Sequence, residues 1–308
     1  MKIVAFAYHD VGIVGLESLT ATGNDILHIF SHEDDPRELV WFGSVVAWAK
    51  ERKISCSCPT SINDGEVMEI IKSLNPDAIF SFYYRNMIGE AILAIPPLGA
   101  YNLHGSLLPQ YRGRVPINWA LINGEKETGV TLHHMVVRAD AGDIVAQRAF
   151  PIAEDDTALT LYQKLCLEAR VLLQEFVPLI ATKTAPRIKQ DLSKGGYYGK
   201  RTPEDGRIDW EQGARSIYNL IRAVTHPYPG AFCFLSSGEK MLVWWARPCG
   251  EDHSTAGAGE VLLQNGAVCV GTGGGGLVQL EEIEIAGGIM NTHEIFRFFE
   301  ELKGVKLQ

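Results

Sequence analysis

The chain has 308 residues, a formal net charge of −9 and 46% hydrophobic residues. This length and apolar fraction allow one large domain or two domains of ordinary size, each with a packed core. Because an acidic chain is not broadly attracted to phosphate backbones, we expect no nucleic acid partner.

Six cysteines are scattered along the chain without a regular spacing. This pattern favours free thiols in a reducing compartment over a disulfide framework. The opening MKIVAFAYHD lacks the apolar core of a signal peptide, and no apolar run is long enough to cross a membrane. We therefore expect a cytoplasmic protein with no membrane partner. The oligomeric state cannot be predicted from the sequence.

The first part of the chain alternates between strand and helix patterns. Strands are predicted at residues 2–8, 25–32 and 77–84, and helices at residues 11–21, 42–52 and 66–74. This alternation predicts an α/β fold, a Rossmann-like open and mostly parallel sheet with helices on both faces. Gly12 and Gly15 do not complete a dinucleotide-binding glycine triplet, so we expect them to shape a tight strand-to-helix turn.

The segment 99–114, GAYNLHGSLLPQYRGR, holds the main candidate site. Its strand pattern breaks at Gly105 and Pro109, and a helix pattern begins near Pro116. The break places Asn102 and His104 at the end of a strand. Ligands bind at the carboxyl ends of strands in open α/β sheets, and residues two apart on a strand point the same way. Since a single Asn or His at a strand end is usually a turn residue, the pair needs further support.

That support comes from residues 129–147. An extended run, GVTLHHMVV, ends in a turn that contains Asp140, and a second strand begins at Asp143. A carboxylate beside an imidazole stabilises its protonated form, so we expect Asp140 to keep His104 charged and able to act as an acid. An amide donor and an imidazolium suit acyl-type transfer.

No metal site is expected from the sequence. His133 and His134 are adjacent in a predicted strand, so their side chains should face opposite ways and cannot share a metal ion. Cys56 and Cys58 are not accompanied by a second ligand pair, which a zinc site needs.

The second part of the chain predicts a smaller domain. A long amphipathic helix at residues 157–182 should close the first domain, and the turn-rich stretch 195–210 should lead to another helix at 213–224. From residue 231 onward, short strands alternate with glycine-rich turns, which predicts a small β-barrel or sandwich. The run GTGGGG at 271–276 is expected to be a hairpin turn. We predict a catalytic domain at residues 1–200 and a C-terminal domain with its linker and helix at 201–308.

The segments NLHGSLLPQYRGR and ETGVTLHHMVVRADAGDIVAQ together resemble the folate-dependent formyltransferases. That family shares an Asn-x-His pair, an SLLP-x-x-RG loop and a distal Asp-x-Gly before a strand. The segments FAYHDVGIVGLESL, FSFYYRNMI, RTPEDGRIDW and RAVTHPYPGAF extend the likeness over nearly the whole chain, and it is weakest after Arg247.

The resemblance implies a Rossmann-like catalytic domain followed by an oligonucleotide-binding-like (OB-like) β-barrel, with 10-formyltetrahydrofolate as co-substrate. It assigns catalysis to Asn102, His104 and Asp140. The positions that match the family's folate contacts are Asn86, Met87, Ile88, Arg114, Val136, Val137, Arg138, Ala139 and Asp140.

The resemblance is strongest to members that formylate nucleotide-linked amino sugars. It implies UDP-4-amino-4-deoxy-L-arabinose, a precursor for the lipid A modification that gives polymyxin resistance, as the acceptor. Members with this acceptor carry a second, dehydrogenase half, so the chain is expected to be either a stand-alone protein or a part of such an enzyme.

Other acceptors stay open. Relatives formylate dTDP- or GDP-linked 4-amino sugars with the same catalytic residues, and a hydrolase would use water. Methionyl-tRNA is disfavoured because the loop after the second strand, SHEDDPRELVW, is acidic here, whereas binding RNA needs cations.

Overall fold

The computed structural model describes residues 1–35, 39–249, 256–302 and 304–308. Contacts along the chain divide it into two compact units. Unit 1 comprises Met1–Pro116, Glu127–Pro151 and Tyr162–Gly199, and unit 2 comprises Ile117–Lys126, Ile152–Leu161 and Lys200–Gln308.

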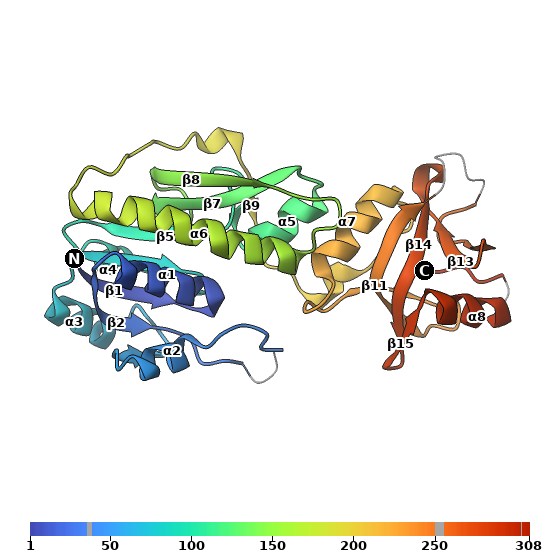
Figure 1. The fold of residues 1–308 in the computed structure, drawn as a ribbon, viewed down its shortest axis with the longest axis horizontal. Helices are drawn as coiled ribbons and strands as arrows, with labels where there is room; N and C mark the ends of the chain where they lie inside the picture. The colour runs from blue at the N-terminus through green and yellow to red at the C-terminus, as the bar shows by residue number, and fades with distance from the viewer. Residues whose placement is uncertain (36–38, 250–255, 303) are drawn as a thin grey trace. The chain divides into compact units, whose positions relative to one another are not determined.

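Unit 1 is built on a seven-stranded sheet in the order β3-β2-β1-β4-β5-β7-β8 (Figure 1). The strands are β1 (Lys2–Ala7), β2 (Asp25–Phe30), β3 (Cys56–Ser57), β4 (Ala78–Phe82), β5 (Ala100–His104), β7 (Glu127–His134) and β8 (Ile144–Pro151). The first five are parallel to one another, and β7 and β8 are antiparallel to their neighbours. The predicted mostly parallel α/β sheet is confirmed.

Helices cover both faces of this sheet, because its strands are apolar on both sides. On one face, α3 (Gly65–Leu74) and α4 (Glu90–Leu93) pack into a core cluster with side chains of β1, β2 and β4. On the other face, α1 (His9–Ala21) lies directly against β4, and an ion pair of 2.7 Å between Arg170 and Glu17 links it to α6 (Ala158–Ala181). This unit also contains α2 (Val45–Glu51) and a short 3-10 helix, η1 (Leu192–Lys194).

The expected turn role of Gly12 and Gly15 is wrong. Both residues lie inside α1, which already begins at His9. A Cβ on Gly15 would come within 2.4 Å of the Phe82 ring, and one on Gly12 within 3.1 Å of Val45. These glycines are therefore needed for close packing of the helix on the sheet.

Unit 2 contains an antiparallel sheet in the order β10-β11-β14-β13-β12, with β15 paired to β14. Its strands are β10 (Ala231–Phe234), β11 (Lys240–Cys249), β12 (Val261–Gln264), β13 (Ala267–Gly271), β14 (Leu277–Ile285) and β15 (Gly288–Asn291). The predicted hairpin turn at 271–276 is confirmed, since Gly271 pairs with Leu277 across it.

The helices of unit 2 include two that the sequence predicted and one that it did not. They are α5 (Pro116–Ile122, of which all but Pro116 belongs to unit 2), α7 (Ala214–Val224) and α8 (Thr292–Leu302). The helix α8 was not predicted, although Ile295 and Phe299 form its buried face at a spacing of one turn. In the part of the chain that the structure describes, no helix is both long and apolar enough to cross a bilayer.

Candidate active site

The candidate site lies at the carboxyl end of β5. Asn102 and His104 are two residues apart on this strand, between the parallel neighbour β4 and the antiparallel neighbour β7. The register places Asn102 opposite His133 of β7. His133 is a candidate site residue that the sequence considered only as a metal ligand. The strand pairing that brings it to the site is not visible in the chain order.

Asp140 reaches the same point from the turn between β7 and β8. Its carboxylate Oδ1 lies 3.6 Å from Nδ1 of His104, 3.6 Å from Nε2 of His133 and 3.5 Å from Nδ2 of Asn102. The other oxygen, Oδ2, accepts a 2.8 Å hydrogen bond from the backbone N–H of Gly113. The structure therefore brings together the three residues that the sequence assigned to catalysis.

The ring of His104 has a defined orientation. Its Nε2 lies 2.8 Å from the carbonyl oxygen of Tyr111 and must donate to it, because a carbonyl only accepts. Nδ1 is therefore the nitrogen that faces Asp140 and can exchange a proton. Tyr111 adopts a positive φ of 56° and stacks on Tyr198, so the loop that offers this carbonyl is held in an unusual backbone conformation.

Asn102 is oriented by His133. The Nδ1 atom of His133 donates to the carbonyl of His134 at 2.8 Å, which leaves Nε2 to accept from the amide of Asn102 at 3.1 Å. The second N–H of that amide makes only the long 3.5 Å contact with Asp140. This N–H can turn to a ligand oxygen, since hydrogen bonds in empty active sites are often long.

Asp140 is charged in this environment. Burial alone would raise the pKa of Asp140, but the charge of His104, the contacts with His133 and the N–H of Gly113 together hold it well below the ordinary carboxyl value. A fixed negative charge beside Nδ1 stabilises a protonated His104 ring during proton transfer.

The loop that covers His104 is fastened to β7 and β8. The Thr131 hydroxyl donates to the carbonyl of Ser106 at 2.6 Å and accepts from the N–H of Leu108 at 3.1 Å. The side-chain amide of Gln147 donates to the carbonyl of Leu108 at 2.9 Å. These bonds hold the SLLP segment, which follows His104 closely in the sequence, against β7 and β8.

The residues that match folate contacts lie on two nearby segments of unit 1. The loop with Asn86, Met87 and Ile88 follows β4, and Asn63 braces it through a 2.9 Å bond to the Met87 carbonyl. The guanidinium of Arg114 donates to the carbonyl of Arg85 at 3.3 Å and so lies against this loop.

The second segment, residues 136–140, follows β7. Met135 at its start and Ile88 share one core cluster, which links the two segments. Met87, Val136 and Val137 expose 56%, 43% and 59% of their surface. Arg138 is also exposed, while Ala139 and Asp140 are half-buried. Exposed apolar side chains on both segments suit a flat, partly apolar ligand.

A second group of polar side chains lies at the ends of β1 and β4, and the sequence analysis did not identify it. His9 has a positive φ of 69°, stacks on Phe42 with centroids 3.6 Å apart and is hydrogen-bonded to Tyr162. Burial and the nearby charge of Arg85 lower the pKa of His9 to about 3, so this ring is neutral. The sheet order reverses between β1 and β4, which is where open α/β sheets bind ligands.

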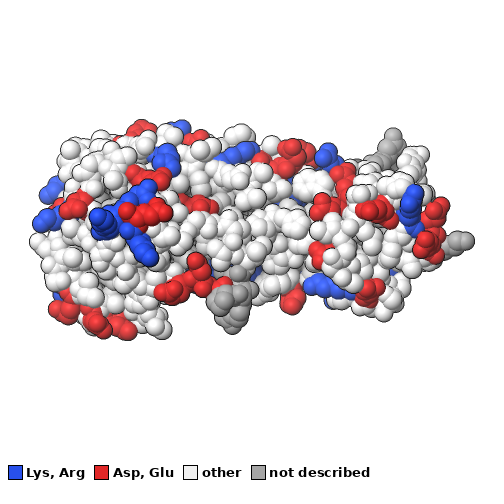
Figure 2. All heavy atoms as spheres, turned by 60° about the horizontal axis from the view of Figure 1, so that its bottom comes forward, with Lys and Arg blue, Asp and Glu red and all other residues white. Residues whose placement is uncertain are grey.

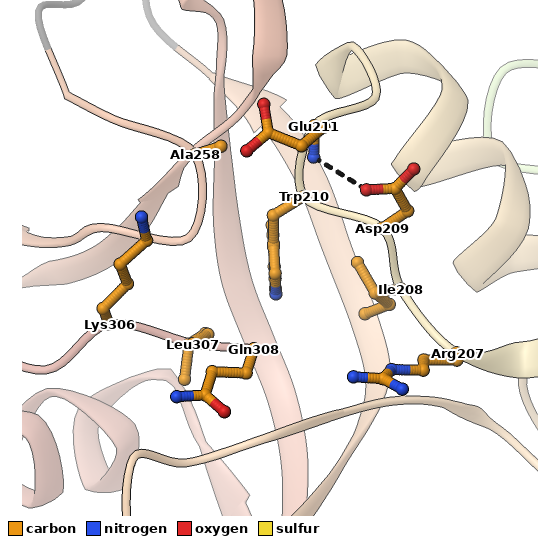
Figure 3. Close-up of a pocket in the computed structure, with 9 residues that line it drawn as sticks. All are labelled: Arg207, Ile208, Asp209, Trp210, Glu211, Ala258, Lys306, Leu307 and Gln308. Carbon is orange, nitrogen blue, oxygen red and sulfur yellow. Dashed lines mark hydrogen bonds between the residues drawn. The ribbon is translucent and has the colours of Figure 1, made fainter.

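Unit 2 holds a separate cavity of about 470 Å³ (Figure 3). Cations and acids both line it, with Arg207 and Lys306 on its walls together with Asp209 and Glu211. The dashed line in Figure 3 is the bond of 3.0 Å from the Glu211 N–H to Asp209. None of the residues that the sequence assigned to catalysis or folate binding lines this cavity.

Known families match this chain along most of its length. The family described as "Formyl transferase" matches residues 18–177, and the one described as "Formyl transferase, C-terminal domain" matches residues 200–299. The first match alone covers more than half of the chain, so the chain belongs to the formyl transferase family.

Solved structures share the fold. An N-formyltransferase from Helicobacter canadensis, solved with folinic acid and dTDP-3-aminofucose, has a TM-score of 0.69 and 19% identity over 91% of this chain and 98% of its own. WlaRD, a sugar 3N-formyltransferase solved with dTDP and 5-N-formyltetrahydrofolate, has a TM-score of 0.70 and 18% identity over 94% and 98%. HypX from Aquifex aeolicus, solved with tetrahydrofolic acid, has a TM-score of 0.58 and 20% identity over 99% of this chain and 48% of its own.

Proposed function

We propose that this protein transfers the formyl group of 10-formyltetrahydrofolate to the 4-amino group of a nucleotide-linked amino sugar, with UDP-4-amino-4-deoxy-L-arabinose as the acceptor. The observation that carries the proposal is the convergence of Asn102, His104 and Asp140 at one strand end. An amide donor and an imidazole backed by a carboxylate are the groups that acyl transfer to an amine requires.

The chemistry needs no covalent enzyme intermediate. The amine nitrogen forms a bond to the formyl carbon, and negative charge develops on the formyl oxygen. The N–H of Asn102 that makes the long contact with Asp140 can turn to this oxygen and stabilise the charge. The bond between that carbon and N10 of the folate then breaks. His104 donates a proton from Nδ1 to the departing nitrogen, and water or a carboxylate takes the proton from the amine. Holding both reactants in one site supplies much of the rate.

The folate would lie between the loop of Asn86, Met87 and Ile88 and the segment 136–140, with Arg114 beside it. The exposed apolar surfaces of Met87 and Val137 support this placement. The structures of the Helicobacter canadensis enzyme and of WlaRD contain reduced folates, which adds support for the same class of donor here.

The choice of a nucleotide sugar over tRNA as the acceptor rests on the charge of the surface. In the loop after β2, Glu33, Asp34 and Asp35 are acidic, while Pro36, Arg37 and Glu38 lie outside the described residues. On the face drawn in Figure 2, Lys and Arg atoms form small groups interspersed with Asp and Glu. A surface of this kind favours a small nucleotide sugar over tRNA, which needs an array of cations. The dTDP-3-aminofucose in the structure of the Helicobacter canadensis enzyme and the dTDP in that of WlaRD support a nucleotide-linked sugar as the substrate class.

We further propose that residues 1–200 carry catalysis and that residues 201–308 form a separate C-terminal domain. All the residues assigned above to catalysis and folate binding lie in unit 1, which supports the first part.

A mass-spectrometric assay tests the proposal. The protein is incubated with 10-formyltetrahydrofolate and, in parallel, with UDP-4-amino-4-deoxy-L-arabinose, dTDP- and GDP-linked 4-amino sugars, methionyl-tRNA or water alone. We expect a mass gain of one formyl group on the UDP sugar. Formylation of methionyl-tRNA alone, or release of formate at the same rate without any amine, would overturn it.

A further inference from the structure

Residues 185–199, here called the return segment, follow α6 and run back along the sheet of unit 1; Figure 1 shows them in yellow, above β8 in that view. Ile188 forms a two-bond bridge with Ile144, the first residue of β8. Further along, β9 (Tyr197–Tyr198) pairs in parallel with β6 (Arg112–Gly113). The return segment thus pairs with the start of β8, just after the Asp140 turn, and with the loop that contains Gly113.

Between these two anchors, Gln190 reaches the turn of Asp140. Its side-chain amide donates to the carbonyl of Asp140 at 3.0 Å and to the carbonyl of Gly142 at 2.5 Å. Only 8% of Gln190 is exposed. Both hydrogens of the amide are therefore committed to the backbone on either side of Ala141.

Gln190 adds to the bonds that fix this turn, which include the one from the Gly113 N–H to the Asp140 carboxylate, and it is the side chain that bonds to the backbone beside Asp140. Asp140 has a positive φ of 51°, a conformation that costs free energy in any residue other than glycine. Within the turn, the hydrogen bond from Ala141 to Arg138 is long, at 3.3 Å. The bond from His134 to Asp143 closes its base at 2.8 Å but does not reach Asp140.

We propose that Gln190 is a positioning residue that sets the place of the Asp140 carboxylate opposite His104. The role rests on the proposed function, because it matters only if those two side chains act together. The two hydrogen bonds of the Gln190 side chain go to the backbone of the turn, and the side chain is uncharged, so it acts on the position of Asp140 and brings no charge to the site.

The charged and titratable groups that face Asp140 are His104 from β5 and His133 from β7, and the N–H of Gly113 completes its surroundings. These contacts hold the pKa of Asp140 low against the effect of burial. If the turn moves, the contacts lengthen while the burial stays. The pKa of Asp140 then rises, and the acidic limb of the rate profile moves to higher pH.

The test compares Gln190→Met with Asn24→Leu. Each substitution keeps most of the volume of the side chain and removes its amide donors. Asn24 is the control, because its amide also makes two bonds, to the Leu19 carbonyl at 3.0 Å and the Thr22 hydroxyl at 2.9 Å. It directly precedes β2, at the opposite end of the parallel strands from the site. Both variants lose two hydrogen bonds of the amide, so a fall in the melting temperature is expected of each.

Two readouts separate positioning from stability. We expect Gln190→Met to lower kcat about tenfold or more and to move the acidic limb of the pH profile upward, since small displacements of reacting groups are costly. Asn24→Leu should leave the profile where it is. The NMR signals of the His104 ring in Gln190→Met should shift toward those of Asp140→Asn, and those of Asn24→Leu should not.

Unchanged His104 signals and an unmoved profile in Gln190→Met would overturn the proposal, as would equal changes in both variants. The NMR measurement needs no substrate. If the wild-type protein formylates no acceptor, the proposed function fails, while the His104 signals still decide whether Gln190 positions Asp140.

Discussion

The sheets of units 1 and 2 differ in where non-glycine residues with a positive φ lie. Several non-glycine residues of unit 1 have a positive φ near the carboxyl end of a strand. His9 and Tyr83 follow β1 and β4, and Asp140 lies in the turn after β7. In unit 2, Asn265 and Ala286 have positive φ in tight turns between antiparallel strands, followed directly by Gly266 and Gly287.

The difference supports the proposal that the sheet of unit 1 carries the chemistry. The turns of unit 2 are ordinary hairpins whose conformation the local sequence favours. In unit 1, Tyr111 and Asp140 have a positive φ and lie against the buried His104, and Gln190 bonds to the backbone of the Asp140 turn from a distant part of the chain. Backbone strain that needs distant support is typical of functional sites.

The largest expected effect is that of His104→Ala. Formyl transfer should fall about 10²–10⁴-fold, because the proton donor to the departing nitrogen is lost. The measurement is kcat/KM with the preferred nucleotide sugar, with circular dichroism as a control for folding. A folded variant with wild-type turnover would remove the basis for assigning the chemistry to unit 1.

Asp140→Asn should lower turnover by about 10²-fold, because the neutral amide cannot stabilise a protonated His104. The pKa of Asp140 is lower in the folded protein than in the unfolded chain, so its ionisation stabilises the fold above the unfolded value and ceases to do so as the pH falls.

The lowered pKa of Asp140 predicts how the difference in melting temperature between the wild type and Asp140→Asn depends on pH. Their difference should be constant from neutral pH down to about 4 and should shrink below it, near the ordinary carboxyl value. A difference that grows in acid would show that the contacts of Asp140 do not favour its charged form.

Gly142→Ala probes the turn itself. A Cβ at this position would lie 1.9 Å from the carbonyl oxygen of His134, so the turn must shift. We expect a loss of about 2 kcal/mol in the free energy of unfolding, together with reduced turnover. Gly65→Ala is the control, because a Cβ there meets nothing within 4 Å at the start of α3. Equal effects in denaturant unfolding would contradict the close approach.

The smallest effect is expected in unit 2. Trp244 is buried, stacks on His226 with centroids 3.7 Å apart and donates to Glu284 at 2.9 Å. Trp244→Phe should cost about 1 kcal/mol of stability through the lost hydrogen bond. Turnover of the folded variant should not change. A fall in kcat at saturating substrate, with no change in melting temperature, would show that unit 2 takes part in the reaction.

Local patterns in the sequence were sufficient for much of the fold. Strand alternation and helical spacing predicted the βαβ order, the long helix α6 and the hairpin turn at 271–276, and all of these are present. These patterns failed for glycine, which occurs both in tight turns and where a helix packs closely on a sheet. Gly12 and Gly15 suggested a turn, but they allow α1 to pack closely on its sheet.

The sequence by itself determined that Asn102 and His104 point the same way, because alternation along a strand is a local property. It also indicated an acid in the turn after β7. Only the tertiary structure decided that His133 orients Asn102, that the Tyr111 carbonyl fixes the His104 ring and that Gln190 holds the Asp140 turn. The physical reason is that strand register and long-range contacts depend on how whole elements pack, and no short window of sequence contains that information.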